Sequence, residues 1–429
     1  TARPAPMLAL LHALSASVTD APGVLRFGII GTGCIGQEHL RNLHLIPECQ
    51  VVAIADNHEA SLAAGHETLR KQGADEGVVC VADYRELLAL PQVDAVLVAT
   101  PNDHHRACLR DVAASGKHCL VEKPLCVDIA GCAEAEALAA RAAAAAQERG
   151  APPPLYWVGM EYRYMPTISK LIADADAGVA GELRMLTIRE HRFPFLRKVG
   201  NWNRYSARTG GTLVEKCCHF FDLMRRITRS EPLRIIASGG HDVNHKDVVY
   251  EDGSKADILD NAYVVVEMEG GARAMLELCM FAEASKHQEE VSLVGTRGKL
   301  EAFAPSHGVR TDDPDLINYR RGLRNPTFAA GEWELTEPPP VEELGSLHEE
   351  HVGVDAALLE AGNHGGATHH QLQAFARAAL RGDPPVVGLR DGSKAVLMGL
   401  AAHRSIETGR AVPWREMLDE FEAARAQYA

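Results

Sequence analysis

The chain has 429 residues, 46% of them hydrophobic and 24% charged, and its formal net charge is -14. These values are typical of a globular protein with two or three domains. The negative charge would repel a phosphate backbone or an anionic membrane surface, so we expect small-molecule ligands and no nucleic-acid partner. No apolar run approaches the roughly 20 residues that cross a bilayer, so we expect no membrane partner.

Two features bear on the cellular compartment. Residues 1–24 precede the first predicted strand, and their acid-poor run Met7-Leu8-Ala9-Leu10-Leu11 predicts a plain helix or arm. The remnant of a targeting peptide over residues 1–20 is the alternative. The ten cysteines include no Cys-x-x-Cys pair, so we expect free thiols in the cytoplasm or another reducing compartment.

A Gly-rich turn follows the first predicted strand. Residues 25–36 read Leu-Arg-Phe-Gly-Ile-Ile-Gly-Thr-Gly-Cys-Ile-Gly, which predicts a strand, a tight turn and the start of a helix. Gly31 permits the turn, Gly33 lets the backbone approach a pyrophosphate, and Gly36 lets the helix pack on the strand. The helix N-terminus directs amide hydrogens at the phosphates. We therefore expect a dinucleotide to bind at Gly31, Thr32, Gly33, Cys34, Ile35 and Gly36.

A carboxylate ends the second predicted strand. Asp56 follows the apolar run 51–55 and lies twenty residues after Gly36, where a ribose-binding acid belongs. This carboxylate would repel a 2′-phosphate, and the next residues, Asn57 and His58, supply no arginine. The sequence therefore favours NAD over NADP.

The first part of the chain predicts an α/β domain over residues 25–160. Apolar strands alternate with amphipathic helices, a pattern typical of a doubly wound parallel sheet. The predicted strands are 25–30, 50–55, 78–81, 94–99, 118–121 and 155–160. The predicted helices are 34–45, 60–72, 104–115 and 128–149.

The pattern changes in residues 161–413. A helix to about residue 177 precedes alternating runs that predict a large open, mainly antiparallel sheet: 183–192, 233–239, 261–268, 272–281, 290–294 and 299–303. In this α+β domain we expect helices such as 212–227 to cover one face of the sheet. A second subunit would cover the other face, giving a homodimer or homotetramer. Residues 304–353, with three consecutive prolines, predict a surface insertion. Helices are predicted at 369–380 and 391–407. Residues 414–429 form a separate C-terminal element, with a helix predicted at 414–426.

Polar residues follow the fourth and fifth predicted strands, at the sheet edge where open α/β folds bind ligands. Thr100, Pro101, Asn102 and His105 follow the fourth strand, and Glu122 and Lys123 follow the fifth. A lysine near a nicotinamide can hydrogen-bond a substrate hydroxyl and stabilise a developing alkoxide. A surface lysine in a loop is the alternative.

A second polar cluster follows Gly210-Gly211. If the segment is helical, Glu215 and His219 lie four residues apart on one face, with Asp222 one turn further. A histidine suits acid/base chemistry on a secondary alcohol, and a neighbouring carboxylate can orient it or bind a second hydroxyl. A structural histidine is the alternative. A metal site is another, although no third ligand has convincing spacing.

Four motifs together resemble the Gfo/Idh/MocA oxidoreductases, the glucose-fructose oxidoreductase and inositol dehydrogenase group. They are Gly31-x-Gly33-x-x-Gly36, Thr100-Pro101-Asn102-x-x-His105, Glu122-Lys123-Pro124, and Gly210-Gly211 followed by Glu215-x-x-x-His219-x-x-Asp222. The resemblance covers residues 25 to about 413. It implies a Rossmann domain, a C-terminal α/β domain used for dimers or tetramers, and a cis peptide before Pro124.

The resemblance also implies roles for individual residues. Lys123 would be the catalytic lysine that contacts substrate and nicotinamide, and His219 the general base. Glu215 stands where many members have Asp, and Glu161 stands where Asn is usual. Substrate contacts would come from Glu215, Asp222, Arg163 and Tyr164, and from the loop residues Trp202, Asn203 and Arg204. An ordinary ordered loop is the alternative for these three loop residues, and much the same holds for two further candidates, His364 and His369.

These observations predict an NAD-dependent dehydrogenase that transfers hydride between nicotinamide and a secondary alcohol of a cyclic polyol, sugar or sugar derivative. Net NADH production would separate it from one alternative, a redox-assisted glycoside hydrolase with tightly bound NAD. A second alternative is a nucleotide-binding regulator without enzymatic activity. The substrate class rests on the resemblance more than on the residues.

Overall fold

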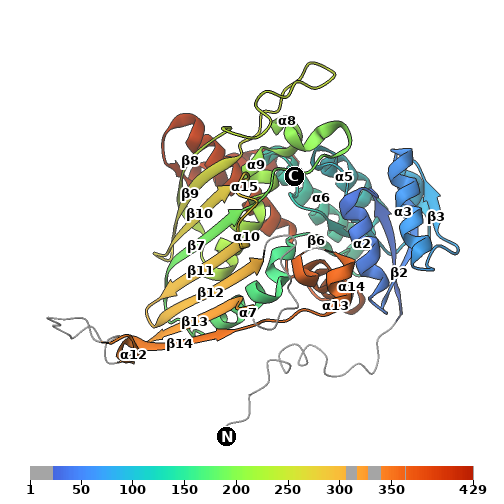
Figure 1. Cartoon of the computed structure of the whole chain (residues 1–429). Coiled ribbons are helices and arrows are strands. Elements are labelled where there is room, and N and C mark those ends of the chain that lie inside the picture. Colours follow the sequence, from blue (N-terminus) through green and yellow to red (C-terminus); the bar gives the residue numbers. More distant parts are fainter. Residues whose placement is uncertain (1–22, 306–315, 327–339, 363, 429) are drawn as a thin grey trace, which may run out of the picture.

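The computed structural model describes residues 23–305, 316–326, 340–362 and 364–428. They form a six-stranded parallel sheet with helices on both sides and a nine-stranded sheet (Figure 1). The expected fold class, a Rossmann domain followed by an α+β domain with a large open sheet, is confirmed. The expected domain boundaries stay a prediction.

The parallel sheet has the strand order β3-β2-β1-β4-β5-β6, in which the order reverses between β1 and β4. Every predicted strand is present: β1 Leu25–Ile30, β2 Cys49–Ala55, β3 Val79–Val81, β4 Ala95–Val98, β5 His118–Val121 and β6 Tyr156–Val158. The connecting helices are α2 Cys34–His44, α3 Glu59–Lys71, α4 Tyr84–Ala89, η1 Asn102–His104 with α5 His105–Ser115, and α6 Ile129–Glu148. The reversal at β1 and β4 makes their carboxyl ends the place where this fold binds ligands.

The nine-stranded sheet has the order β14-β13-β12-β11-β7-β10-β9-β8-β15 and is antiparallel except where β10 runs parallel to β7. Its strands are β7 Leu183–His191, β8 Pro232–Gly240, β9 Asn261–Met268, β10 Arg273–Cys279, β11 His287–Gly295, β12 Gly298–Pro305, β13 Tyr319–Arg324, β14 Gly345–Glu350 and β15 Val412–Pro413. The six predicted strands are confirmed. Alternate residues of β9 are buried, so one face of the sheet packs on helices and the other is open.

The prediction of a surface insertion over residues 304–353 is wrong for its described part. Strands β13 and β14 extend the sheet edge, and Arg320 and Glu349 form a cross-strand ion pair at 2.6 Å. Charged side chains are common on edge strands because they oppose further pairing, and they concealed the strand pattern. Tyr319 is fully buried and donates to Asp174 at 2.6 Å. The remainder, 306–315 and 327–339, lies outside the described residues.

The single helix predicted over residues 212–227 is also wrong. It is divided into α9 Thr212–Glu215 and α10 Cys218–Thr228. The carbonyl oxygen of Glu215 accepts a hydrogen bond from Lys123 Nζ at 3.1 Å. A contact from the other domain thus uses a carbonyl that an uninterrupted helix would have paired internally.

The remaining helices follow β6 in the chain. They are η2 Glu161–Tyr164, α7 Pro166–Asp176, η3 Val199–Arg204, α8 Ser206–Thr209, α12 Val341–Leu344, α13 Ala356–Ala361, η4 His364–Gly366, α14 Ala367–Arg381, α15 Leu389–Thr408 and α16 Trp414–Ala426. Helix α16 packs on α6, and α14 packs on α2, so the end of the chain returns to the Rossmann domain. All ten cysteines are free thiols. In the described parts of the chain, no helix has the length and apolarity to cross a membrane.

Candidate active site

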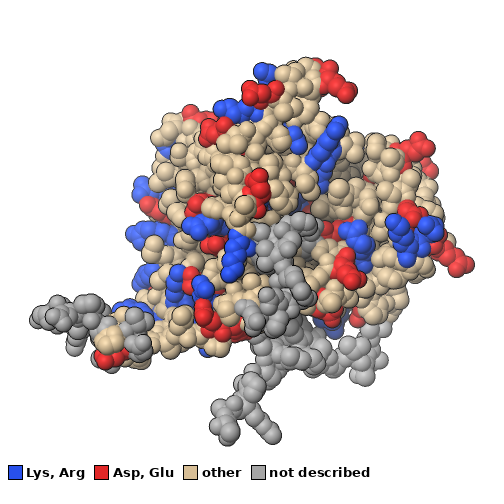
Figure 2. All heavy atoms as spheres, viewed as in Figure 1, with Lys and Arg blue, Asp and Glu red and all other residues tan. Residues whose placement is uncertain are grey.

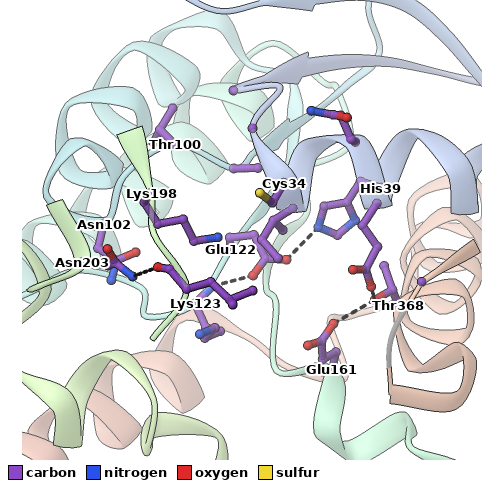
Figure 3. Close-up of a pocket in the computed structure, with 18 of the residues that line it drawn as sticks. Cys34, His39, Thr100, Asn102, Glu122, Lys123, Glu161, Lys198, Asn203 and Thr368 are labelled. Atoms are coloured by element: carbon purple, nitrogen blue, oxygen red, sulfur yellow. Dashed lines mark hydrogen bonds and ion pairs between the residues drawn. The ribbon is translucent and has the colours of Figure 1, made fainter. Parts of the chain in front are cut away.

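A cavity of about 1780 Å³ lies between the two domains. One wall is formed by the carboxyl ends of β1, β2, β4 and β5. The other wall is formed by residues 192–203 after β7, the α9–α10 junction and the start of β11. Figure 3 shows side chains from both walls directed into this space.

The glycine turn lies at the carboxyl end of β1. Gly31 has φ +94°, and a β-carbon there would come within 2.6 Å of the Ala99 carbonyl oxygen. A β-carbon on Gly33 would meet no atom within 4 Å, so this position leaves space above the backbone. A β-carbon on Gly36 would collide with the carbonyl oxygen of Gly31. Gly36 therefore packs against the turn itself as well as near the strand, a closer approach than we expected.

Asp56 lies beside this turn and lines the cavity. Its Oδ2 accepts from the backbone N–H of Thr32 at 2.8 Å, and its Oδ1 accepts from that of His58 at 2.8 Å. The Thr32 hydroxyl also lies 3.3 Å from Oδ2, whereas Oδ1 can accept a further hydrogen bond, so the residue remains suited to a ribose hydroxyl. Thr32 itself is buried and acts through Asp56, whereas Cys34, Ile35 and Asn57 line the cavity.

Unpaired polar atoms follow β4. Thr100 Oγ1 and Asn102 Nδ2 are buried without a hydrogen-bond partner, and both residues line the cavity with Pro101. His105 does not line it, because its two ring nitrogens lie against the carbonyl oxygens of Pro124 and Thr100, at 2.8 and 3.2 Å. Buried polar atoms of a native protein are normally paired, so Thr100 and Asn102 fit a bound dinucleotide.

The turn after β5 places Lys123 in the cavity. The peptide bond before Pro124 is cis, as the resemblance implied. Glu122 is held by His39, whose Nε2 lies 2.7 Å from Glu122 Oε1. Burial would lower the pKa of His39, but the hydrogen bond to Glu122 raises it overall. These contacts fix the backbone from which Lys123 projects.

Lys123 and Glu215 join the two walls. Lys123 Nζ donates to the carbonyl oxygen of Glu215 and lies 3.7 Å from its carboxylate Oε1. Burial opposes the charge on Lys123, but the Glu215 carboxylate outweighs it and raises the pKa of the lysine. Lys123 therefore carries its proton at neutral pH. Glu215 Oε2 has no hydrogen-bond partner and could receive one from a ligand.

His219 lines the same end of the cavity. It is 2% exposed, and its ring stacks on Tyr162 at a centroid distance of 4.1 Å and an interplanar angle of 6°. Burial, followed by the positive charge of Lys123, lowers the pKa of His219 well below its ordinary value. The imidazole is therefore neutral at pH 7 and able to accept a proton.

A buried charge network supports Tyr162. Lys216 Nζ donates to the Tyr162 hydroxyl at 2.6 Å and lies 2.9 Å from Glu190 Oε1. The Tyr162 hydroxyl in turn donates to Glu289 Oε1 at 3.0 Å. Glu190, Lys216 and Glu289 are almost completely buried. No local pattern in the sequence indicates these three residues, because they come from β7, the α9–α10 junction and β11.

Glu161 of η2 belongs to a second buried group, which also contains Glu38 of α2 and Thr368 of α14. The hydroxyl of Thr368 lies 2.9 Å from both Glu161 Oε2 and Glu38 Oε1, and His364 Nδ1 lies 3.3 Å from Glu161 Oε1. Burial would raise the pKa of Glu161, but His364 lowers it overall; burial and the Glu161 charge raise the pKa of Glu38. Thus His364 contributes to the cavity wall, whereas His369 does not line it.

The structure does not bring four of the expected substrate contacts to the cavity. Arg163 and Asp222 form a paired contact with Nε to Oδ2 at 2.6 Å, and Arg163 also donates to Val386. Tyr164 does not line the cavity either. Arg204 bonds to His245, Tyr250 and the Phe195 carbonyl. Internal partners occupy the charged groups, whereas Trp202 and Asn203 do line the cavity.

In the described chain, no group of three or more His, Cys, Asp and Glu side chains is arranged to hold a metal ion. Glu215 and His219 therefore have no third ligand in the described structure. Lys123 and His219, almost a hundred positions apart in the sequence, line one end of the cavity. Their charge states, a protonated lysine and a neutral histidine, suit proton removal beside a developing oxyanion.

Comparison with known proteins identifies the family. Residues 25–148 match the oxidoreductase family with an NAD-binding Rossmann fold, and residues 175–414 match its C-terminal alpha/beta domain. The chain belongs to the Gfo/Idh/MocA oxidoreductase family. It is an NAD-dependent oxidoreductase that acts on CH–OH groups.

Relatives of this Gfo/Idh/MocA protein include inositol dehydrogenases. It is 26% identical over 398 residues to myo-inositol 2-dehydrogenase of Thermotoga maritima, which covers 92% of this chain and 100% of that protein. It is 34% identical over 301 residues to inositol 2-dehydrogenase of Pseudomonas savastanoi pv. phaseolicola, covering 68% and 79% of the two chains.

Solved structures share the fold. An oxidoreductase domain protein from Kribbella flavida has a TM-score of 0.72 at 21% identity and covers 91% of this chain and 99% of its own. Levoglucosan dehydrogenase in complex with NADH has a TM-score of 0.69 at 17% identity, covering 91% and 98%. At these identities the likeness concerns the fold alone.

Proposed function

We propose that this protein oxidises a ring hydroxyl of a cyclic polyol, such as an inositol, or of a related sugar derivative. The substrate hydroxyl would lie between Lys123 and His219. The observation that carries the proposal is that these two groups line one end of the cavity, with Lys123 protonated and His219 neutral. The names of the relatives support the substrate class.

The proposed chemistry assigns each group one task. His219 removes the hydroxyl proton, and the ammonium of Lys123 stabilises the oxygen as negative charge develops on it. Bound NAD supplies the hydride acceptor. Glu215 holds Lys123 through its carbonyl and one carboxylate oxygen, and its other oxygen is available for a second substrate hydroxyl.

The Rossmann wall of the cavity has a feature that favours NAD over NADP. The Asp56 carboxylate lines the cavity beside the glycine turn, where it would accept hydrogen bonds from ribose hydroxyls and would repel a 2′-phosphate. We therefore propose NAD as the working cofactor, with NADP disfavoured.

The test is a substrate screen with purified protein and NAD. Inositols, aldoses, anhydrosugars and glycosides are added separately, and NADH absorbance is followed, with the Lys123→Met variant as the blank. We expect stoichiometric NADH with at least one cyclic polyol. Release of sugar from a glycoside without net NADH would replace the proposal with redox-assisted hydrolysis, and inactivity with every class would overturn it.

We also propose that the open face of the nine-stranded sheet joins two copies of the chain. Ile236, Val265 and Met275 are register partners across β8, β9 and β10, and Val265 is on the face opposite the buried residues of β9. Tyr263 of β9 and Met185 of β7, which flank this row on opposite sides, are 58% and 56% exposed. Figure 2 shows charged side chains interspersed over this side of the molecule with uncharged surface between them.

The surrounding ion pairs fit such an interface. Arg234 pairs with Glu267 at 2.7 Å, and Arg189 pairs with Glu277 at 3.0 Å, on either side of the apolar row. An apolar centre with a polar rim is the usual composition of a subunit interface. Light scattering should give a multiple of the 46.4 kDa chain mass, and Val265→Glu should shift it to the monomer. A wild-type monomer at micromolar concentration would contradict this proposal.

A further inference from the structure

The cavity contains two cations without partners. Of its seven lysine and arginine residues, five pair with carboxylates: Arg85 with Asp111, Lys123 with Glu215, Arg192 and Lys216 with Glu190, and Arg208 with Asp103. The side chains of the other two, Arg197 and Lys198, make no ion pair or hydrogen bond to any part of the chain that the structure describes. They are adjacent in the loop after β7.

Hydrogen bonds between the residues that precede the two cations and those that follow them hold this loop in place. Asn203 is buried, and its Nδ2 donates to the carbonyl oxygen of Leu196 at 2.9 Å. Arg204 donates to the carbonyl oxygen of Phe195 at 3.2 Å, and the Phe195 ring is buried. Lys198 therefore projects from a fixed backbone, and little loop entropy would be lost when it binds a ligand.

The direction of Lys198 identifies what it faces. Figure 3 shows its side chain extending across the cavity toward Cys34 in the glycine turn and Glu122 after β5. Arg197, by contrast, is exposed. The Rossmann wall there supplies the N-terminus of α2, whose first turn contains no acidic residue, but no unpaired lysine or arginine. Backbone amides alone would face the two negative charges of a pyrophosphate.

We propose that Lys198, a residue of the C-terminal domain, binds the dinucleotide pyrophosphate from the side opposite the glycine turn. The ammonium would add a charge-assisted hydrogen bond to those of the turn amides. This inference deepens the proposed function, since both concern the same cavity, but it assigns cofactor affinity to the domain that carries the substrate groups.

The test measures binding without turnover. NADH and ADP-ribose, which share the pyrophosphate, and adenosine, which lacks it, are titrated against wild type, Lys198→Met and Lys198→Arg. The matched control is Lys246→Met, because Lys246 is an exposed lysine outside the cavity with no partner in the described structure. Melting temperature checks that each variant is folded.

We expect Lys198→Met to weaken NADH and ADP-ribose by about 10-fold, the usual range for loss of one charge-assisted contact. The salt dependence of both affinities should also fall. Lys198→Arg should restore most of the affinity, while adenosine and the Lys246→Met variant should not change. This outcome would hold even if the substrate class were wrong.

Two results would overturn the inference. The first is unchanged NADH and ADP-ribose affinity in Lys198→Met. The second is a rise only in the KM of an active alcohol at saturating NAD, which would place Lys198 against an anionic or polar group of the substrate. Failure of the proposed function would instead appear as tight NADH binding with no oxidation of any polyol.

Discussion

The two walls of the cavity are built from different parts of the chain. The Rossmann wall presents the glycine turn, the loop after β4 and the cis-Pro turn from which Lys123 projects, each following its strand directly. The opposite wall presents side chains from β7, η2, the α9–α10 junction and β11, which meet around Tyr162. The proposed chemistry needs both walls, because Lys123 follows β5 whereas Glu215 and His219 come from α9 and α10.

The difference also concerns charge. The turn binds through amides that need no counter-charge, whereas Lys216 and Glu190 are buried together and depend on each other. Removing one member of such a pair leaves an unpaired buried charge, which commonly costs about 3–5 kcal/mol. The opposite wall is therefore more sensitive to single charge changes, whereas the Rossmann wall is more sensitive to added side-chain volume.

The largest expected effect is the loss of the Lys123 charge. Lys123→Met should lower kcat by about 10³-fold, because no other group replaces the cation beside the developing oxyanion. NADH affinity should change little, since the glycine turn remains intact. Steady-state rates and an NADH titration measure both quantities. Lys71→Met, an exposed lysine on α3, is the control. Wild-type turnover in Lys123→Met would remove this residue from the chemistry.

Two alanine substitutions test the glycine turn of the Rossmann wall. Gly36→Ala forces a methyl group against the Gly31 carbonyl and should destabilise the fold by about 1–3 kcal/mol. Gly33→Ala meets no atom within 4 Å, so the free protein should remain stable while NADH binding weakens by about 10-fold or more. Denaturant unfolding and NADH titration separate the two cases. Undiminished NADH affinity in Gly33→Ala would show that the phosphates do not approach this turn.

A smaller effect is expected at Asp56. Asp56→Ser should reduce the preference against NADP by about 10-fold, because the carboxylate that opposes a 2′-phosphate is lost. The ratio of kcat/KM for the two cofactors is the measurement. Asp56 also accepts from Thr32 and His58, so the melting temperature should be compared. An unchanged cofactor ratio would mean that discrimination lies elsewhere.

The pH dependence of kcat/KM tests His219, on the opposite wall, without any substitution. His219 must be neutral to accept a proton, and its pKa is lowered by burial and by Lys123. The value of kcat/KM should therefore stay level as the pH falls through about 6.5, the ordinary pKa of histidine, and decline only below it. A half-maximal rate at or above pH 6.5 would contradict a buried neutral base.

The sequence predicted the Rossmann wall well, because each element there follows a local pattern. Gly31, Gly33 and Asp56 lie where a strand–turn–helix unit places them, and their motif spacing is short. Lys123 was also singled out by its place after the fifth predicted strand, and His219 by its spacing from Glu215. The family motifs then implied their roles. For the site residues, the individual roles stay predictions.

The rest depends on contacts between distant residues. Glu190, Lys216 and Glu289 look like ordinary surface charges until the sheet and the α9–α10 junction bury them together. Arg163 and Arg204 were expected to meet substrate, but their internal partners lie 59 and 41 positions away, at Asp222 and His245. The charged strand β13 was hidden in an expected insertion for the same reason. Long-range pairing decided each case, and a single sequence does not display it.

The most direct test of the account is a double-mutant cycle on Lys123 and His219. Turnover is measured for Lys123→Met, His219→Asn and the double variant with the same polyol and saturating NAD. If both groups act on one hydroxyl, the double variant should be about as slow as the slower single variant. Independent, multiplicative losses would show that the two residues do not act together, and the proposed mechanism would fail.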